Sequence, residues 1–386
     1  MSKRISYLIK EYIYIAILIC PFFIGYSLGE GIVLDATPLN TYSTPSLPFG
    51  IFVVFVSFLF YFTKIEMPIF YIMAILVLLA YLVISFMTPL FVRSIPLFLG
   101  MVVPIINYCI LTNKIKYNTH DIDYYIILRN VCFAVVWIKM ISDVLIFESI
   151  TTEFIFTEDI AIYNYFDYFP FFYCVTVLFI FEDIIKNNRL TIFSILTIIV
   201  CFAATLNAHS RVFQGLIILS PFFLIYFKYV HIKIKTMSYL IIWIVVIATL
   251  ITGLFFHESV GSDPSLTLRF GHWHEFFVVS SIQTVFVPLF NPYRLSMDSG
   301  TTHNEILEIY TLFGVGVVFF MVVFTDIFAK VKNAMKPLSS TVLIILLLGT
   351  LIQLNITNPH LGILWSTFIA TMSIPKGAKH QMAQQS

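Results

Sequence analysis

Long apolar runs separated by short polar turns recur along the whole chain, and they set the expected fold. A helix that crosses the hydrocarbon core of a bilayer needs about 20 apolar residues, within a range of roughly 17–25. Segments of this kind can be placed from one end of the 386 residues to the other. Their expected bounds are 12–28, 49–63, 67–87, 95–112, 124–147, 168–184, 190–208, 211–227, 238–256, 305–324, 339–354 and 361–374. The pattern predicts an all-α polytopic membrane protein, with about 12 transmembrane helices forming a single domain over 1–386.

The composition agrees with a lipid environment. Apolar residues make up 59% of the chain and charged residues only 11%, whereas a soluble domain carries about 25% charged residues. A transmembrane β-barrel is not expected, because its strands alternate apolar and polar positions and runs such as Val342–Leu348 are apolar throughout. The five cysteines lie inside apolar segments without a motif spacing, so neither a disulfide nor a metal site is predicted.

The distribution of Lys and Arg predicts the orientation of these segments. If the N-terminus is cytoplasmic, most of the 22 basic residues fall at cytoplasmic ends, in agreement with the positive-inside rule. The C-terminus is then cytoplasmic as well. The loops 29–48, 148–167 and 257–304 face the periplasm, and the acidic loop 148–167 could form a surface helix. The basic residues left on the outer side are all arginines, namely Arg93, Arg211, Arg269 and Arg294.

Polar residues gather in three clusters on this outer side, and the first is the turn 207–211. Arg211 opens the eighth segment, where free backbone N–H groups and the helix dipole favour a phosphate. Its guanidinium can hold a phosphate through two parallel hydrogen bonds. The alternative is an ordinary turn whose arginine reaches to lipid headgroups.

The second cluster is Leu268–Glu275, within the long outer loop. Arg269 and Trp273 are four residues apart and share one face if this stretch is helical. Tryptophan stacks on sugar rings and also anchors proteins at membrane interfaces. His272 and His274 lack a third ligand at a recognised spacing, so they do not predict a metal site.

The third cluster is Thr301–Glu305, at the start of the tenth segment. Histidine side chains titrate near neutral pH, so His303 is a plausible general base; the alternative is an imidazole that merely caps the helix. Tyr310 and Gly314 follow His303 by 7 and 11 residues, which returns both near the same helical face.

With these clusters in this order, the chain resembles the O-antigen polymerase and O-antigen ligase family of bacterial envelope enzymes. The matching residues are Ser210-Arg211, then Arg269 and Trp273, then His303-Asn304 followed by Gly314. The architecture matches over the whole chain and the motifs match over about 207–317. The ligase pattern has Gly, Thr or Tyr three residues after the glycine. Val317 stands there, which favours a polymerase over a ligase.

The resemblance implies a GT-C-like membrane glycosyltransferase of the bacterial inner membrane, with its active site facing the periplasm. Its substrates would be undecaprenyl-pyrophosphate-linked oligosaccharides of lipopolysaccharide biosynthesis, and transfer would proceed with inversion and without a metal or another cofactor. Membrane lipids and a chain-length regulator protein are the expected partners, and no nucleic acid is expected.

The same resemblance assigns roles to the clustered residues. Arg211 and Arg269 would hold the pyrophosphate, and His303 would accept the proton of the acceptor hydroxyl. Arg294 is a further candidate for binding the substrate. The remaining substrate-binding candidates are His209, Ser210, Trp273, Tyr293, Asn304 and Tyr310.

Two other functions stay open. A ligase would transfer the finished polymer to lipid A-core instead of extending it. A flippase or transporter for a lipid-linked sugar suits twelve spans equally well, and its one supporting feature is Lys139 with Asp143 in the fifth segment.

Overall fold

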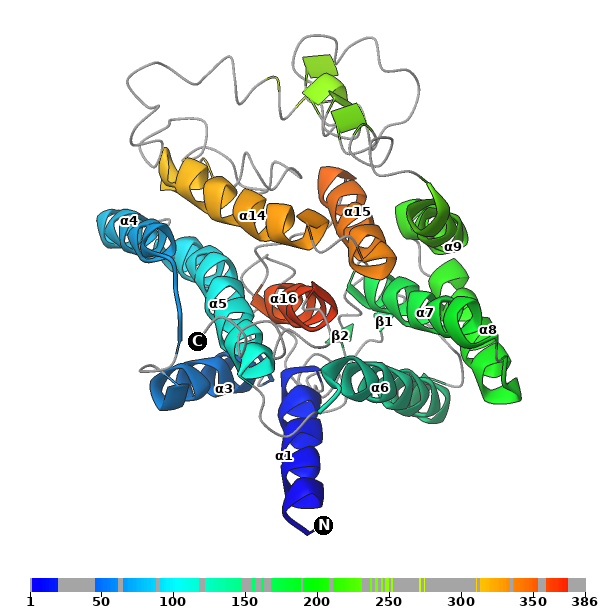
Figure 1. Cartoon of the computed structure of the whole chain (residues 1–386). Coiled ribbons are helices and arrows are strands. Elements are labelled where there is room, and N and C mark those ends of the chain that lie inside the picture. The colour runs from blue at the N-terminus through cyan, green and yellow to red at the C-terminus, as the bar shows by residue number, and fades with distance from the viewer. Residues whose placement is uncertain are drawn as a thin grey trace.

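The computed structural model shows a bundle of helices (Figure 1). It describes residues 2–19, 46–61, 65–87, 91–117, 122–147, 155–156, 161–162, 168–188, 190–207, 211–230, 313–333, 336–352 and 359–373, with single residues and runs of two or three between 237 and 310. The helices are α1 (Ser2–Ile19), α3 (Ser46–Tyr61), α4 (Ile69–Ser85), α5 (Phe91–Lys116), α6 (Tyr124–Phe147), α7 (Tyr168–Asn187), α8 (Ile192–Asn207), α9 (Arg211–Tyr229), α14 (Gly316–Asn333), α15 (Pro337–Ile352) and α16 (Pro359–Ser373).

Most of these helices coincide with the predicted segments to within a few residues. One clear difference is at the N-terminus, where α1 begins at Ser2 and not near residue 12. Its first turns contain Lys3, Arg4 and Lys10, which favour a helix although they do not belong in the hydrocarbon core. Within the predicted segment 238–256, the described residues are helical.

The predicted helix over 305–324 is interrupted. Gly314 has a positive φ of 50°, and the regular helix α14 begins only at Gly316. A residue without a side chain enters this left-handed region at little cost, so Gly314 ends one helical stretch and lets the chain change direction before the next.

The suggestion of a surface helix in the acidic loop 148–167 is wrong for its described residues. The strands β1 (Ile155–Phe156) and β2 (Ala161–Ile162) pair antiparallel, with Ile155 opposite Ile162. β-branched and aromatic side chains favour strands, and here they outweigh the acidic residues around them. The rest of the described chain is helical or lies in turns and short connections.

Helix α16 lies at the centre of the bundle with α5 beside it (Figure 1). The two helices run parallel, as the contacts between them show. Gly362 on α16 approaches Pro104 on α5 so closely that a Cβ at Gly362 would lie 2.4 Å from the proline Cγ. Further along both helices, the side-chain amide of Asn107 donates to the hydroxyls of Ser366 and Thr367 at 2.9 and 3.0 Å. Small and polar residues at a helix contact are typical of packing in membranes, where close approach replaces the hydrophobic effect.

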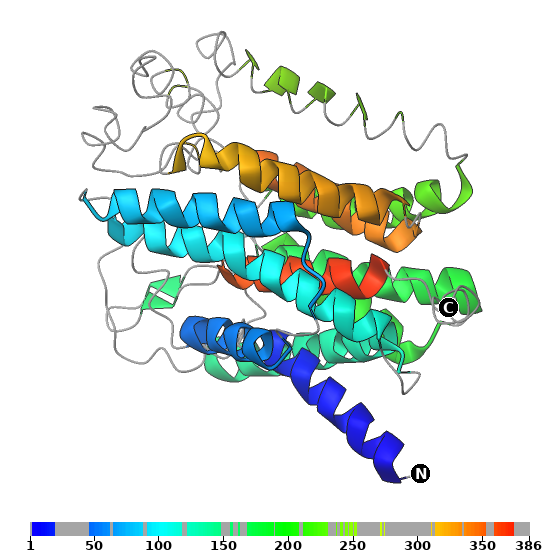
Figure 2. The same cartoon turned by 60° about the vertical axis from the view of Figure 1, so that its left-hand side comes forward.

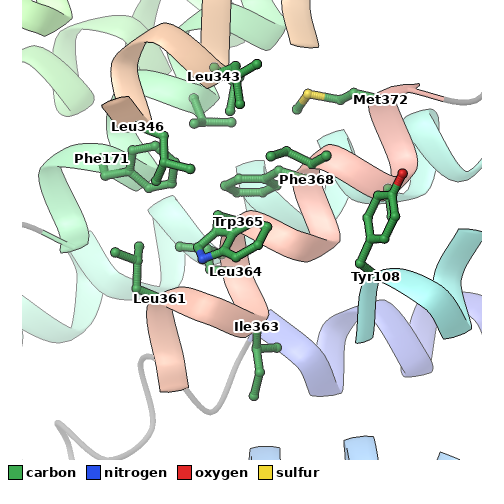
Figure 3. Packing of buried hydrophobic residues seen from close by; sticks show 14 of the residues in the cluster. Tyr108, Phe171, Leu343, Leu346, Leu361, Ile363, Leu364, Trp365, Phe368 and Met372 are labelled. Carbon is green, nitrogen blue, oxygen red and sulfur yellow. The ribbon is translucent and has the colours of Figure 1, made fainter. Parts of the chain in front are cut away.

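Aromatic rings fill the space between α16 and its neighbours. Trp365 and Phe368 on α16 are fully buried, and Phe368 packs against Phe171 on α7 (Figure 3). Trp365 meets Phe324 of α14 edge to face, with ring centroids 5.5 Å apart. Burying rings of this size accounts for a large share of the packing energy of the bundle.

Large apolar side chains also cover the outside of the bundle. Ile69 on α4 and Ile192 on α8 are 79% and 78% exposed. Among the described residues, the stretches Leu97–Lys116 and Tyr124–Ile141 are long and apolar enough to cross a membrane, and several apolar helices are shorter. An apolar core inside an apolar exterior is what a helical protein in lipid requires.

The N-terminal end of α1 and the C-terminal end of α16 lie on the same side of the bundle (Figure 2). Glu11, in the middle of α1, pairs with Lys114 near the end of α5, so α1 passes that end of the bundle. Because α16 runs parallel to α5, it also ends there.

Candidate functional site

The two ends of the bundle differ in how their polar residues are used. At the end where α5 and α14 finish, Lys114 pairs with Glu11 at 2.8 Å and Lys330 pairs with Asp326 at 2.7 Å. We call this the charged end. Further ion pairs at this end are Lys116–Glu66, Arg129–Asp183 and Lys186–Glu182.

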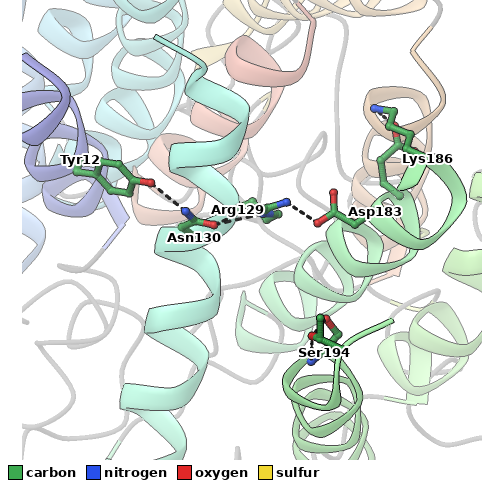
Figure 4. Close-up of polar contacts among 8 residues, drawn as sticks. Tyr12, Arg129, Asn130, Asp183, Lys186 and Ser194 are labelled. Carbon is green, nitrogen blue, oxygen red and sulfur yellow. Dashed lines mark hydrogen bonds and ion pairs between the residues drawn. The ribbon is translucent and has the colours of Figure 1, made fainter. Parts of the chain in front are cut away.

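The pair Arg129–Asp183 lies within a longer polar chain (Figure 4). The Arg129 guanidinium also donates to the side-chain oxygen of Asn130, and the Asn130 amide donates to the Tyr12 hydroxyl at 2.9 Å. The contacts connect α1, α6 and α7, so Arg129 is engaged by groups of its own chain. Its role is the fastening of helices.

Glu66, in the connection between α3 and α4, is the most exposed member of these pairs. Lys116 donates to its carboxylate at 2.6 Å, and the Tyr117 hydroxyl donates to the other oxygen. These two hydrogen bonds hold the pKa of Glu66 below its ordinary value.

Arg211 lies at the opposite end of the bundle. It is the first residue of α9, and α8 ends at Asn207, so the turn between the helices is tight. The side-chain amide of Gln214 donates to the carbonyl oxygen of Leu206 at 2.9 Å and ties the start of α9 to the end of α8. The first turn of a helix offers backbone N–H groups without helical partners, which suits an anion.

The helix break at Gly314 also lies at this end, since α14 runs from here towards the charged end. The N–H of Gly314 donates to the carbonyl of Tyr310 at 2.8 Å and closes the last turn before the break. Tyr310 is half-buried against the core. After the break, the N–H of Val317 donates to the carbonyl of Gly314 at 3.2 Å.

A residue that the sequence did not point to, Tyr81 of α4, packs on this break. A Cβ added at Gly316 would lie 3.1 Å from Cδ2 of the Tyr81 ring, so the ring lies close over the glycine backbone. Tyr81 is one of 21 tyrosines and sits in an otherwise apolar segment, so nothing in its surroundings along the chain singles it out. Only the pairing of α4 with α14 identifies it.

Of the predicted site residues, the structure describes the backbone of Arg211 and the whole of Tyr310, at the same end of the bundle. The second cluster contributes His274, which is half-buried. Within the described residues, no three His, Cys, Asp or Glu side chains come together as metal ligands. The predicted site residues outside the described residues are His209, Ser210, Arg269, Trp273, Tyr293, Arg294, His303 and Asn304.

Lys139, the basis of the transporter alternative, is buried on α6 and only 3% exposed. The side chain of Asp143, its expected partner, lies outside the described residues. A buried lysine in an apolar bundle requires compensation, which suits either an internal ion pair or a pathway for ions.

Comparison with known proteins adds no assignment to this geometry. No protein-family model, no curated protein and no solved structure matches the chain. The function is therefore inferred from the residues and from their placement at one end of the bundle.

Proposed function

We propose that the chain is an O-antigen polymerase, a glycosyltransferase that joins undecaprenyl-pyrophosphate-linked oligosaccharide repeat units. The observation that carries the proposal is the order of three motifs, Ser210-Arg211, then Arg269 with Trp273, then His303-Asn304 with Gly314. Its structural support is that the start of α9 and the break at Gly314 both lie opposite the charged end.

The proposed orientation places the charged end in the cytoplasm of a bacterial inner membrane. Basic residues collect at cytoplasmic ends of membrane helices, and Lys114, Lys116, Lys186 and Lys330 lie at the charged end. The site at the opposite end then faces the periplasm. The whole chain is proposed to form one GT-C-like domain of about 12 spans with both termini in the cytoplasm.

The chemistry asked of the site is the displacement of a lipid pyrophosphate by a sugar hydroxyl. The hydroxyl oxygen of the acceptor attacks the anomeric carbon of the donor, the bond from that carbon to the pyrophosphate oxygen breaks, and the configuration inverts. The hydroxyl proton passes to His303. Arg211 and Arg269 neutralise the negative charge that grows on the leaving pyrophosphate, a role that needs no metal ion.

The remaining residues are proposed to bind and orient the substrates. Trp273, Tyr293 and Tyr310 offer aromatic faces for sugar rings, and Arg294 offers a further cation. Of these, Tyr310 has support from its half-buried position beside the break in front of α14.

The test is the lipopolysaccharide ladder of a strain that lacks its own polymerase. Arg211→Ala, Arg269→Ala and His303→Ala should each abolish long O-antigen while the protein stays in the membrane at normal abundance. Arg93→Ala is the matched control, because Arg93 is also expected on the outer side but belongs to no motif. A normal ladder from all three site variants would refute the assignment.

A narrower variant tests the role of the guanidinium group. Arg211→Lys and Arg269→Lys keep the charge but lose the planar fork that binds two phosphate oxygens at once, so both should also fail. Full activity of the lysine variants would show that only the positive charge at these positions matters, and not the shape of the guanidinium group.

The two alternatives give different phenotypes. Loss of a polymerase leaves one repeat unit on the core, whereas loss of a ligase leaves bare core and accumulated lipid-linked polymer. A transporter, which the buried Lys139 would favour, moves its substrate without extending it. Purified protein that polymerises lipid-linked repeats without an energy source would decide against transport.

A further inference from the structure

Helices α4 and α14 are fastened to each other at both ends. At the charged end, the Tyr71 hydroxyl donates to the carboxylate of Asp326 at 2.8 Å, and Lys330 contacts both groups. At the opposite end, Tyr81 of α4 lies over the first residue of α14, Gly316. The two tyrosines are ten residues apart on one helix, and each meets α14 at a different level.

The contact of Tyr81 falls on the break itself and not on a regular helical turn. Its hydroxyl is hydrogen-bonded to the backbone of Val315, the residue that joins Gly314 to α14. At a helix start the backbone N–H groups lack helical partners, so a side chain that binds one stabilises that start. The close ring packing on Gly316 adds a steric limit to the direction in which the chain can leave.

Tyr310 stands on the other side of the same break. It lies near enough to Tyr81 for the two hydroxyl groups to interact electrostatically. The N–H of Gly314 binds the Tyr310 carbonyl, so the position of Tyr310 is tied to the backbone of the break. A displacement of Val315 would therefore be transmitted to Tyr310.

We propose that Tyr81 is a positioning residue of the candidate site: it fixes the helix break at Gly314 and thereby the placement of Tyr310. The inference rests on the proposed function, because it takes Tyr310 and Gly314, seven and eleven residues after His303 in the sequence, as part of that site. Tyr81 itself need not touch either substrate.

A tyrosine that only anchors the protein at the membrane interface would act differently. Such a residue keeps its hydroxyl for water or lipid headgroups, and its loss affects insertion. The Tyr81 hydroxyl is instead directed to the backbone of its own chain. Removal of that hydroxyl alone should thus affect the break and leave membrane insertion unchanged.

The experiment compares Tyr81→Phe with Tyr71→Phe in the full-length protein in lipid nanodiscs. Both variants remove one hydroxyl from α4, but only Tyr81→Phe removes it from the break. Amide hydrogen exchange over residues 313–318 should quicken roughly two- to tenfold in Tyr81→Phe, as expected for the loss of one hydrogen bond, and stay unchanged in Tyr71→Phe. Gly316→Ala, which pushes on the ring from the other side, should quicken the same exchange with Tyr81 intact.

A second readout separates positioning from binding. In polymerisation assays, Tyr81→Phe should lower kcat while KM for the lipid-linked acceptor changes little, and Tyr71→Phe should leave both unchanged per folded molecule. Unchanged exchange at 313–318 in Tyr81→Phe, or faster exchange with an unchanged kcat, would overturn the proposal. If the unaltered protein has no polymerase activity, faster exchange would still support the fastening by Tyr81, and only the proposed function would fall.

Discussion

The charged end and the opposite end of the bundle differ in what holds α4 and α14 together. At the charged end, Tyr71, Asp326 and Lys330 bind one another, so side chain meets side chain and each charge has a counter-charge. At the opposite end, Tyr81 packs on a glycine backbone where the helix is interrupted. At the charged end, side-chain contacts hold α4 and α14 together. At the opposite end, the contact depends on a backbone geometry that only glycine adopts easily.

The division agrees with the proposed chemistry. An arginine whose charge is already matched, such as Arg129 beside Asp183, has little capacity left to bind a pyrophosphate. Arg211 instead opens a helix, a position where an external anion is favoured by the backbone. Substitutions at the charged end should therefore reduce stability, and those at the opposite end should mainly reduce activity.

The largest effect on stability is expected where α5 and α16 pack against each other, between the two ends of the bundle. In Gly362→Ala the new methyl group would lie 2.4 Å from Cγ of Pro104 and 3.3 Å from the carbonyl oxygen of Gly100. A proline ring and a backbone carbonyl cannot move aside easily, so α5 and α16 must separate, at a cost of about 3 kcal/mol. The measurement is unfolding in detergent by titration with sodium dodecyl sulfate.

Gly215→Ala is the matched control for that variant. Gly215 lies inside α9 with nothing within 4 Å of an added Cβ, so alanine should stabilise the helix by up to about 1 kcal/mol. Equal effects of the two substitutions would contradict the close packing of α5 and α16.

A second prediction breaks the attachment at the charged end. Asp326→Ala leaves the Tyr71 hydroxyl without its acceptor and Lys330 without its counter-charge, which should lower the free energy of unfolding by about 2 kcal/mol. Both charged side chains are partly exposed, and water limits the cost. Asp326→Asn, which retains an acceptor, should lose less. Activity per folded molecule should be unchanged. A loss of activity greater than the loss of folded protein would contradict the view that the charged end serves stability alone.

A third prediction concerns the opposite end. Gly314→Ala places a side chain at a φ of 50°, which costs about 1–2 kcal/mol. Part of that strain can be relieved by a shift of the break, so activity should fall further than stability. The Tm and the polymerisation rate of the same preparation give the comparison, and a variant that loses stability alone would show that the break has no part in the site.

The helices themselves were predictable because each follows a long, nearly uninterrupted apolar run in the sequence. The apolar run over 124–147 predicts α6 with the bounds that the structure gives. The start of α1 was not predictable from apolar length, since its first turns are helical without being apolar. The pairing of β1 with β2 was missed because two-residue strands have no period long enough to detect.

The candidate site was predictable only in part, and for a different reason. Motif order pointed to Arg211 and Gly314, and the structure places both at one end of the bundle. The glycine was expected to lie on a helical face, whereas it interrupts the helix, because spacing along a chain carries no information on φ. Tyr81 was missed because its contact with Gly316 is made across two helices more than two hundred residues apart.

The smallest expected effect tests the exposed part of the charged end, at Glu66. Its folded-state pKa is lowered below the ordinary value of 4.5 by hydrogen bonds from Lys116 and Tyr117. A carboxylate with a depressed pKa stabilises the folded state above its unfolded pKa, and this contribution disappears as the pH falls through the folded-state pKa. Glu66→Gln should therefore have a slightly lower Tm than the unaltered protein near neutral pH, and the gap should close below the folded-state pKa of Glu66.

The gap should be small because the Glu66 side chain is 60% exposed, and water screens an exposed ion pair. A double-mutant cycle isolates it from the other carboxylates, which titrate alike in every variant: in a Lys116→Met, Tyr117→Phe background, Glu66→Gln should have no effect on Tm at any pH. A gap of the same size in that background would assign the effect to groups other than these two partners. A gap that widens as the pH falls would mean that the carboxylate is destabilising in the folded state, against the direction that its two hydrogen bonds require.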